Sequence, residues 1–91
     1  MTTNKWDFEF TIDAQKKFKK LDKSVQSQVK KYIEKLLKSE DPIAFAKPLG
    51  FNLKNLWRFR IGNYRMICQI EKNELVILAI DIAHRKEIYE N

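Results

Sequence analysis

Three arginine side chains, Arg58, Arg60 and Arg65, lie within one short segment of the chain. The surrounding residues 42–70 contain five basic residues and no Asp or Glu. A guanidinium group stays protonated and presents a planar set of N–H donors that fits a phosphate. The segment is therefore suited to bind a polyanion and to stabilise negative charge that develops on a phosphate during a reaction.

Two strands and a tight turn are predicted to position these arginines. Apolar and polar residues alternate over 56–61, which is typical of a strand with one buried face. A second strand is predicted over 64–70. Gly62-Asn63 between them is typical of a two-residue hairpin turn. The segment therefore predicts a β-hairpin.

The hairpin register places the three arginines on one face of the ribbon. Arg60 is expected opposite Arg65, and Arg58 opposite Ile67, because the side-chain period of a strand is two. Like charges directly opposite each other are destabilising, and phosphates would relieve that repulsion. The alternative is a solvated face whose charges prevent aggregation. The other face, expected to pack on helices, carries Trp57, Phe59, Ile61, Tyr64, Met66 and Cys68.

The remaining periodicities predict one α+β domain over residues 1–91, in the order β-α-α-β-β-β. An N-terminal strand precedes an antiparallel helix hairpin, and a three-strand antiparallel meander follows. The apolar run near the C-terminus is typical of a central strand covered on both faces. In chain order we expect a strand at 6–12, helices at 14–21 and 25–38, an irregular segment at 43–55 and the last strand at 75–82.

The register of the last strand depends on the turn before it. A turn at residues 71–74 would place Arg65 opposite Ile80. Ile82 and His84 would then lie on the arginine face as well. This register predicts a histidine beside the three guanidinium groups.

Composition excludes several classes of function. The chain of 91 residues has a net charge of +6, two glycines, one cysteine and one histidine. Two glycines are too few for a phosphate-binding glycine loop. One cysteine and one histidine do not make a protein-only zinc site. A lone cysteine also excludes a disulfide framework and favours a reducing, cytoplasmic location. No apolar run is long enough to span a membrane, and we expect neither a metal nor a membrane partner.

Two segments resemble the RelE branch of the RelE/ParE toxin superfamily. They read Leu-Trp-Arg-Phe-Arg-Ile-Gly-Asn-Tyr-Arg-Met-Ile over 56–67 and Ala-His-Arg-Lys-Glu-Ile-Tyr over 83–89. The resemblance implies the toxin of a type II toxin–antitoxin module. Such a toxin cleaves mRNA in the ribosomal A site through attack of a ribose 2′-hydroxyl on the adjacent phosphate. The resemblance therefore implies an endoribonuclease that needs no metal or cofactor.

The resemblance also implies residue roles. Arg65 matches the catalytic arginine after the hairpin, and Arg85 and Tyr89 match the arginine and tyrosine of the C-terminal motif. Arg58 and Arg60 stand where the best-studied type of RelE places two lysines. Arginine is protonated at neutral pH and so cannot act as a general base. Arg58 and Arg60 are therefore limited to binding phosphate and stabilising charge.

The proton acceptor is left open by the sequence. Tyr89 qualifies if neighbouring arginines lower its pKa. His84 qualifies because histidine titrates near neutrality, although the reading slightly favoured is a strand-end residue bonded to backbone. A third option is that positioning on the ribosome carries the rate without a strong base. Lys47 and Lys54, with Arg58, Arg60 and His84, are the candidate RNA-binding residues.

Two other functions fit the same residues. One is a ParE-like inhibitor that binds DNA gyrase without nuclease chemistry, since a shared fold does not settle function. The other is a non-catalytic module that binds RNA or the ribosome. The resemblance also implies a cognate antitoxin, which we expect to be acidic, in addition to the ribosome and mRNA. RelE relatives often continue into a C-terminal helix, which we expect to be missing or truncated after Tyr89.

Overall fold

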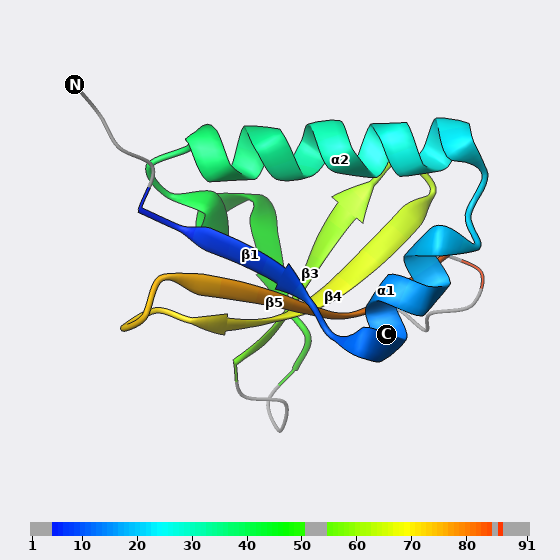
Figure 1. Cartoon of the computed structure of the whole chain (residues 1–91). Coiled ribbons are helices and arrows are strands. Elements are labelled where there is room, and N and C mark those ends of the chain that lie inside the picture. Colours follow the sequence, from blue (N-terminus) through cyan, green and yellow to red (C-terminus); the bar gives the residue numbers. More distant parts are fainter. Residues whose placement is uncertain (1–4, 51–54, 85, 87–91) are drawn as a thin grey trace.

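The computed structural model describes residues 5–50, 55–84 and 86. They form a single sheet with two α-helices, as Figure 1 shows. In chain order the elements are β1 (Asp7–Phe10), α1 (Ile12–Lys19), α2 (Lys23–Lys38), the 3₁₀ helix η1 (Pro42–Phe45), β2 (Ala46–Pro48), β3 (Leu56–Ile61), β4 (Tyr64–Glu71) and β5 (Val76–His84). The α+β class and the order of strand, two helices and antiparallel strands are confirmed.

The sheet has the strand order β1-β5-β4-β3-β2. Neighbouring strands from β2 to β5 are antiparallel, which gives the predicted meander. β1 pairs with β5 in parallel, because the two helices carry the chain back across the sheet before β3 begins. Strand β5 thus lies inside the sheet, as its apolar run predicted.

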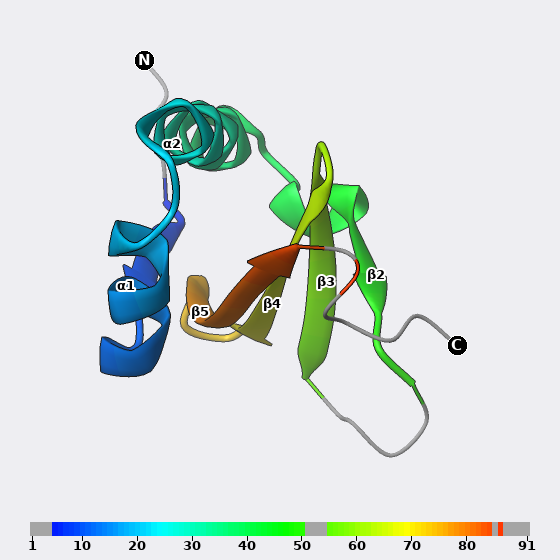
Figure 2. The ribbon, with the colours of Figure 1, turned by 90° about the vertical axis from the view of Figure 1, so that its right-hand side faces the viewer.

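The two helices take different directions. Figure 2 looks almost along α2, while α1 stands upright in the same view, so the pair does not lie as an antiparallel hairpin. Thr11 begins α1 as its N-cap, and its Oγ1 accepts a hydrogen bond from the Ala14 N–H at 3.1 Å. Ala14 and Phe18, four residues apart, are buried. In the part of the chain that the structure describes, no helix is both long and apolar enough to cross a membrane.

The core lies between the sheet and α2. Phe59, Met66 and Cys68 are fully buried on the helix side of β3 and β4, as the alternation predicted. From α2, Val29 and Leu36 complete this core. Burial of such side chains supplies most of the folding free energy of a small domain. The side chains on the helix side of the sheet therefore mainly stabilise the fold.

Residues 43–55 were expected to be irregular, and this expectation is wrong for residues 43–48. Pro42–Phe45 form the helix η1, and Ala46–Pro48 form the edge strand β2 beside β3. Edge strands tolerate proline, because the missing N–H can face solvent. The strand β2 was not predicted, since a segment of three residues that includes a proline is too short to show an alternation of apolar and polar residues.

The predicted register of the last strand is also wrong. Arg65 lies opposite Ala83 instead of Ile80, because the turn falls after Glu71 and an irregularity follows at Ile67/Cys68. This β-bulge adds one residue, Ile80, to β5. A one-residue shift moves each following side chain to the other face.

Candidate nucleic-acid interface

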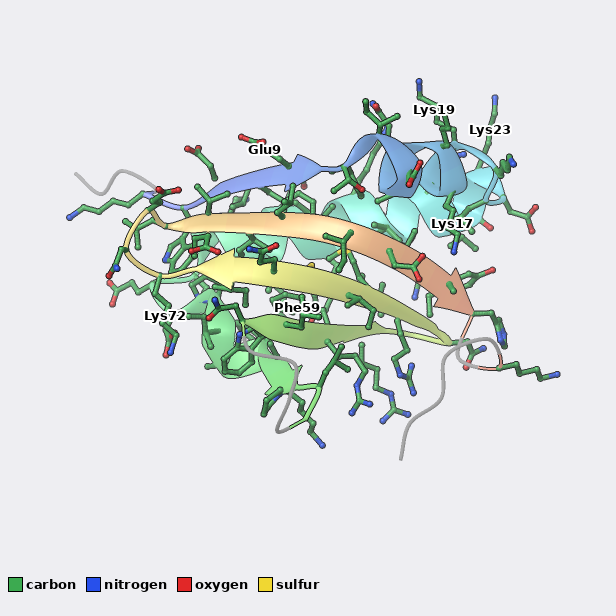
Figure 3. The ribbon with its side chains drawn as sticks, turned by 90° about the horizontal axis from the view of Figure 1, so that it is seen from below. Glu9, Lys17, Lys19, Lys23, Phe59 and Lys72 are labelled. Carbon is green, nitrogen blue, oxygen red and sulfur yellow. The ribbon has the colours of Figure 1, made fainter. Side chains whose placement is uncertain are left out.

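The side of the sheet that faces away from α2 carries the basic residues. Figure 3 looks at this side, with β3 and β4 in front of the helices. The strand registers place two rows of residues across it. We call this surface the open face, and its members are Lys47, Arg58, Ile67 and Asp81 in one row and Arg60, Arg65 and Ala83 in the next.

The β3–β4 hairpin has the register that the sequence predicted, with Arg60 opposite Arg65 and Arg58 opposite Ile67. Its turn contains Gly62 at φ +60°, a conformation that costs other residues more than glycine. A Cβ atom at Gly62 would also lie 2.7 Å from Nε2 of Gln28 on α2. The tip of the hairpin is therefore seated against α2, which fixes the strands that carry the arginines.

Three cations cluster at the β2–β3 side of the open face. Lys47 lies directly opposite Arg58, and Arg60 follows two residues along β3. Lys47 and Arg60 are exposed, and Arg58 is half-buried. Guanidinium and ammonium groups gathered in this way suit a polyanion, because its phosphates accept their charge-assisted hydrogen bonds. The sequence named Lys47 as a candidate but did not place it beside Arg58, because β2 was not predicted.

Arg65 occupies the predicted position but is not an exposed guanidinium. It is 4% exposed. Its Nη1 donates hydrogen bonds to the carbonyl oxygens of Tyr64 at 3.2 Å and Gly62 at 3.4 Å. Bonds from a charged donor to turn carbonyls stabilise that turn. The described contacts of Arg65 thus hold the hairpin from which Arg60 projects.

His84 lies on the helix side, opposite Tyr64, and so the expected placement on the arginine face is wrong. The bulge in β5 causes this, since it moves Ile82 to a position opposite Met66 and His84 with it. The rings of Tyr64 and His84 meet edge-to-face at 5.3 Å. Nδ1 of His84 accepts a hydrogen bond from the Lys86 N–H at 3.2 Å. This geometry supports the reading of His84 as a strand-end residue bonded to backbone.

Asp81 is a member of the open face that the sequence did not identify. The same bulge places it opposite Ile67, in the row that contains Arg58. Its Oδ1 lies 2.7 Å from Nζ of Lys17, which reaches β5 from α1 (Figure 3). Oδ1 also accepts a hydrogen bond from the Ile82 N–H at 2.9 Å. No sequence pattern predicted this carboxylate, because its face depends on the bulge.

The lone cysteine belongs to the core. Cys68 is fully buried, and burial raises the pKa of its thiol far above the usual range. Burial also raises the pKa of Tyr32 on α2, with a further contribution from Cys68. A protonated, buried thiol is a poor nucleophile. Cys68 therefore has a packing role.

Three candidates, Lys54, Arg85 and Tyr89, lie outside the described residues. Within 5–50, 55–84 and 86, no group of three His, Cys, Asp or Glu side chains is placed to hold a metal ion. The site that the structure builds is therefore the cluster of Lys47, Arg58 and Arg60.

Comparison of the sequence with family models gives one match across residues 8–89, to the ParE toxin of the parDE type II toxin–antitoxin system. This match spans both arginine-bearing segments. No curated protein matches the chain significantly.

Solved structures of RelE toxins have the same fold. The toxin–antitoxin complex RelBE2 from Mycobacterium tuberculosis aligns with a TM-score of 0.78 and 22% identity, over 92% of this chain and 95% of that one. The RelE–RelB complex from Pyrococcus horikoshii gives a TM-score of 0.72 and 20% identity, over 92% and 99%. The isolated Escherichia coli RelE toxin gives 0.70 and 23%, over 87% and 83%.

Proposed function

The chain belongs to the ParE toxin family of type II toxin–antitoxin systems, within the RelE/ParE superfamily, and we propose that it acts as a ribosome-dependent endoribonuclease that cleaves mRNA in the A site. The observation that carries this proposal is the cluster of Lys47, Arg58 and Arg60 on the open face. The fold it shares with RelE toxins adds support.

The proposed reaction is attack of a ribose 2′-hydroxyl on the neighbouring 3′-phosphate. Arg58 and Arg60 would bind the phosphate oxygens through charge-assisted hydrogen bonds. Because these bonds strengthen as negative charge grows on the non-bridging phosphate oxygens, they lower the barrier to reaction in addition to binding the substrate. Lys47 extends the same cluster along the RNA backbone. The chemistry needs no metal or cofactor, because the nucleophile belongs to the substrate.

Arg65 would serve this reaction mainly by holding the hairpin turn. Its bonds to the carbonyls of Gly62 and Tyr64 fix the turn that begins at Gly62, two residues beyond Arg60. Holding a binding group in place before the substrate arrives avoids an entropic cost. Lys54, Arg85 and Tyr89 are proposed from the sequence motifs alone as further RNA contacts or catalytic groups.

A cognate antitoxin is the proposed regulator of this surface, in the cytoplasm. RelE proteins from Mycobacterium tuberculosis and Pyrococcus horikoshii are solved in complex with their antitoxins. An acidic segment laid over Lys47, Arg58 and Arg60 would compete with RNA for the same charges. Such competition would make toxicity depend on the ratio of the two proteins.

Induction of the toxin followed by mapping of transcript 5′ ends tests the proposal. Wild-type protein is expected to generate new 5′ ends within translated codons. The double variant Arg58→Gln/Arg60→Gln is expected to generate none while accumulating as folded protein. Cleavage that persists in the double variant, or that occurs equally in untranslated RNA, would contradict the proposal.

Gyrase inhibition is the second candidate, and the family match favours it because that family is described by its ParE toxin. A gyrase poison leaves transcripts intact and causes DNA breaks. The same induction experiment separates the two functions when DNA damage is scored beside the 5′ ends. DNA damage with intact transcripts would replace the nuclease proposal with the ParE-like one.

A further inference from the structure

The proposed reaction lacks a proton acceptor among the residues that the sequence named and the structure describes. A 2′-hydroxyl must lose its proton as it attacks phosphorus. Arg58 and Arg60 are always protonated, so they cannot take it. His84 lies on the helix side, and its Nδ1 already accepts the Lys86 N–H. The inference below rests on the proposed function and concerns this missing group.

Asp81 is placed where such a group is needed. It lies two strands from Arg58 in the same row, with Ile67 between them. Two strand spacings separate the two Cα atoms by about 10 Å. Arg65 is a diagonal neighbour of Asp81, since Arg65 pairs with Ala83, and diagonal neighbours lie about 7–8 Å apart. Ile67 is buried between Arg58 and Asp81, 7% exposed, so a nucleotide that lies across this row would have the Arg58 guanidinium on one side and the Asp81 carboxylate on the other.

The carboxylate of Asp81 is arranged to accept a proton without repelling RNA. Both of its hydrogen bonds, from Lys17 and from the Ile82 N–H, end on Oδ1. Among the described residues Oδ2 has no hydrogen-bond partner, and the side chain is 39% exposed. The ammonium group of Lys17 at 2.7 Å balances the negative charge. Asp81 therefore presents an acceptor oxygen, Oδ2, beside a cation that offsets its negative charge.

We propose that Asp81 is the general base for 2′-hydroxyl attack. Its Oδ2 takes the 2′-hydroxyl proton while the 2′-oxygen forms a bond to the adjacent phosphorus. The bond from phosphorus to the 5′-oxygen of the next nucleotide breaks, and that oxygen leaves with the electron pair and takes a proton from water. The products are a 2′,3′-cyclic phosphate and a 5′-hydroxyl. Asp81 then releases its proton to solvent.

Single-turnover cleavage on purified ribosomes with a defined A-site codon tests this role. The variant Asp81→Asn keeps the size of the side chain but cannot accept the proton. Cleavage is expected to fall about 10²–10⁴-fold, the range for loss of a general base. Binding to the ribosome is not expected to weaken, because the substitution makes the open face more positive. Glu9→Gln is the matched control, since it removes the same charge from the edge strand β1, where Glu9 pairs with Leu78 and lies outside the two rows of the open face (Figure 3).

The variant Asp81→Glu gives a second readout, because it retains a carboxylate at this position. It is expected to cleave more slowly than the wild type but well above the rate of Asp81→Asn. Wild-type rates of cleavage in Asp81→Asn would overturn the role of Asp81 and leave the nuclease function intact. Absence of cleavage by the wild-type protein would overturn both.

Discussion

Two neighbouring residues of β3 show how differently the two sides of the sheet are used. Phe59 is fully buried on the helix side, and Arg60 is exposed on the open face. The helix side gathers apolar side chains that pack against α2. The open face places the cations Lys47 and Arg58 opposite each other, and Arg60 follows along β3. The comparison indicates that one side maintains the fold and the other is available for binding.

The largest effect on stability is expected from the helix side. Phe59→Ala should lower the free energy of unfolding by about 3–5 kcal/mol, because it leaves a cavity in the core. Denaturant unfolding followed by circular dichroism measures this loss. Phe45→Ala is the control, since Phe45 is 41% exposed on η1. Equal losses in the two variants would show that the contrast between the buried and exposed positions is wrong.

Substitutions of the cations on the open face should affect mRNA cleavage more than they affect stability. Arg58→Gln or Arg60→Gln is expected to reduce mRNA cleavage about 10–100-fold each, the value of a charge-assisted hydrogen bond. The melting temperature of Arg60→Gln should stay the same or rise, because Arg60 is exposed and lies opposite another cation, Arg65. Lys19→Gln on α1 removes the same charge from another exposed site and should leave cleavage unchanged. Equal losses of cleavage in Arg58→Gln, Arg60→Gln and Lys19→Gln would show that cleavage depends only on net charge, and would contradict a specific role of the open face.

Substitution of Arg65 should reduce both stability and cleavage, since Arg65 lies in a row of the open face but is buried. Arg65→Met removes the bonds to the carbonyls of Gly62 and Tyr64 and should cost about 1–3 kcal/mol of unfolding free energy. Cleavage should fall as well, because the turn beside Arg60 loosens. Chemical denaturation and single-turnover cleavage measured on the same preparation test this. A variant that loses cleavage at full stability would assign Arg65 a direct role at the phosphate.

The smallest effect is expected for chemical modification of Cys68. Burial raises the pKa of its thiol, so the group stays protonated even at mildly alkaline pH, where an exposed cysteine forms thiolate. Alkylation of the native protein should therefore be slow at pH 8–9 and become fast on unfolding. Mass spectrometry after timed alkylation measures both rates. Rapid modification of the folded protein would show that the helix side is open near β4.

The sequence predicted those parts of the fold that have a clear period. The β3–β4 hairpin was correct pair by pair, because alternation and Gly62-Asn63 specify its register. The bulge that shifts β5 was not predictable, since it inserts Ile80 into a continuous apolar run. Three consequences follow from that one residue: Ile82 and His84 lie on the helix side, and Asp81 lies on the open face.

The candidate site was predicted in part for the same reason. Residue type alone identified Arg58, Arg60 and Lys47 as cations of a segment without acids. Type alone did not reveal that Arg65 bonds to the turn, because a buried arginine and an exposed one look identical in a sequence. The contact between Lys17 and Asp81 could not be predicted either, since 64 residues separate them in the sequence.

The central claim is that the cations of the open face hold mRNA for cleavage. The most direct test mixes purified toxin with ribosomes stalled at a defined codon on end-labelled mRNA. The account predicts a cut in the A-site codon by wild-type protein, and none by Arg58→Gln/Arg60→Gln at equal concentration and equal thermal stability. A cut of the same rate and position by the double variant would contradict the account.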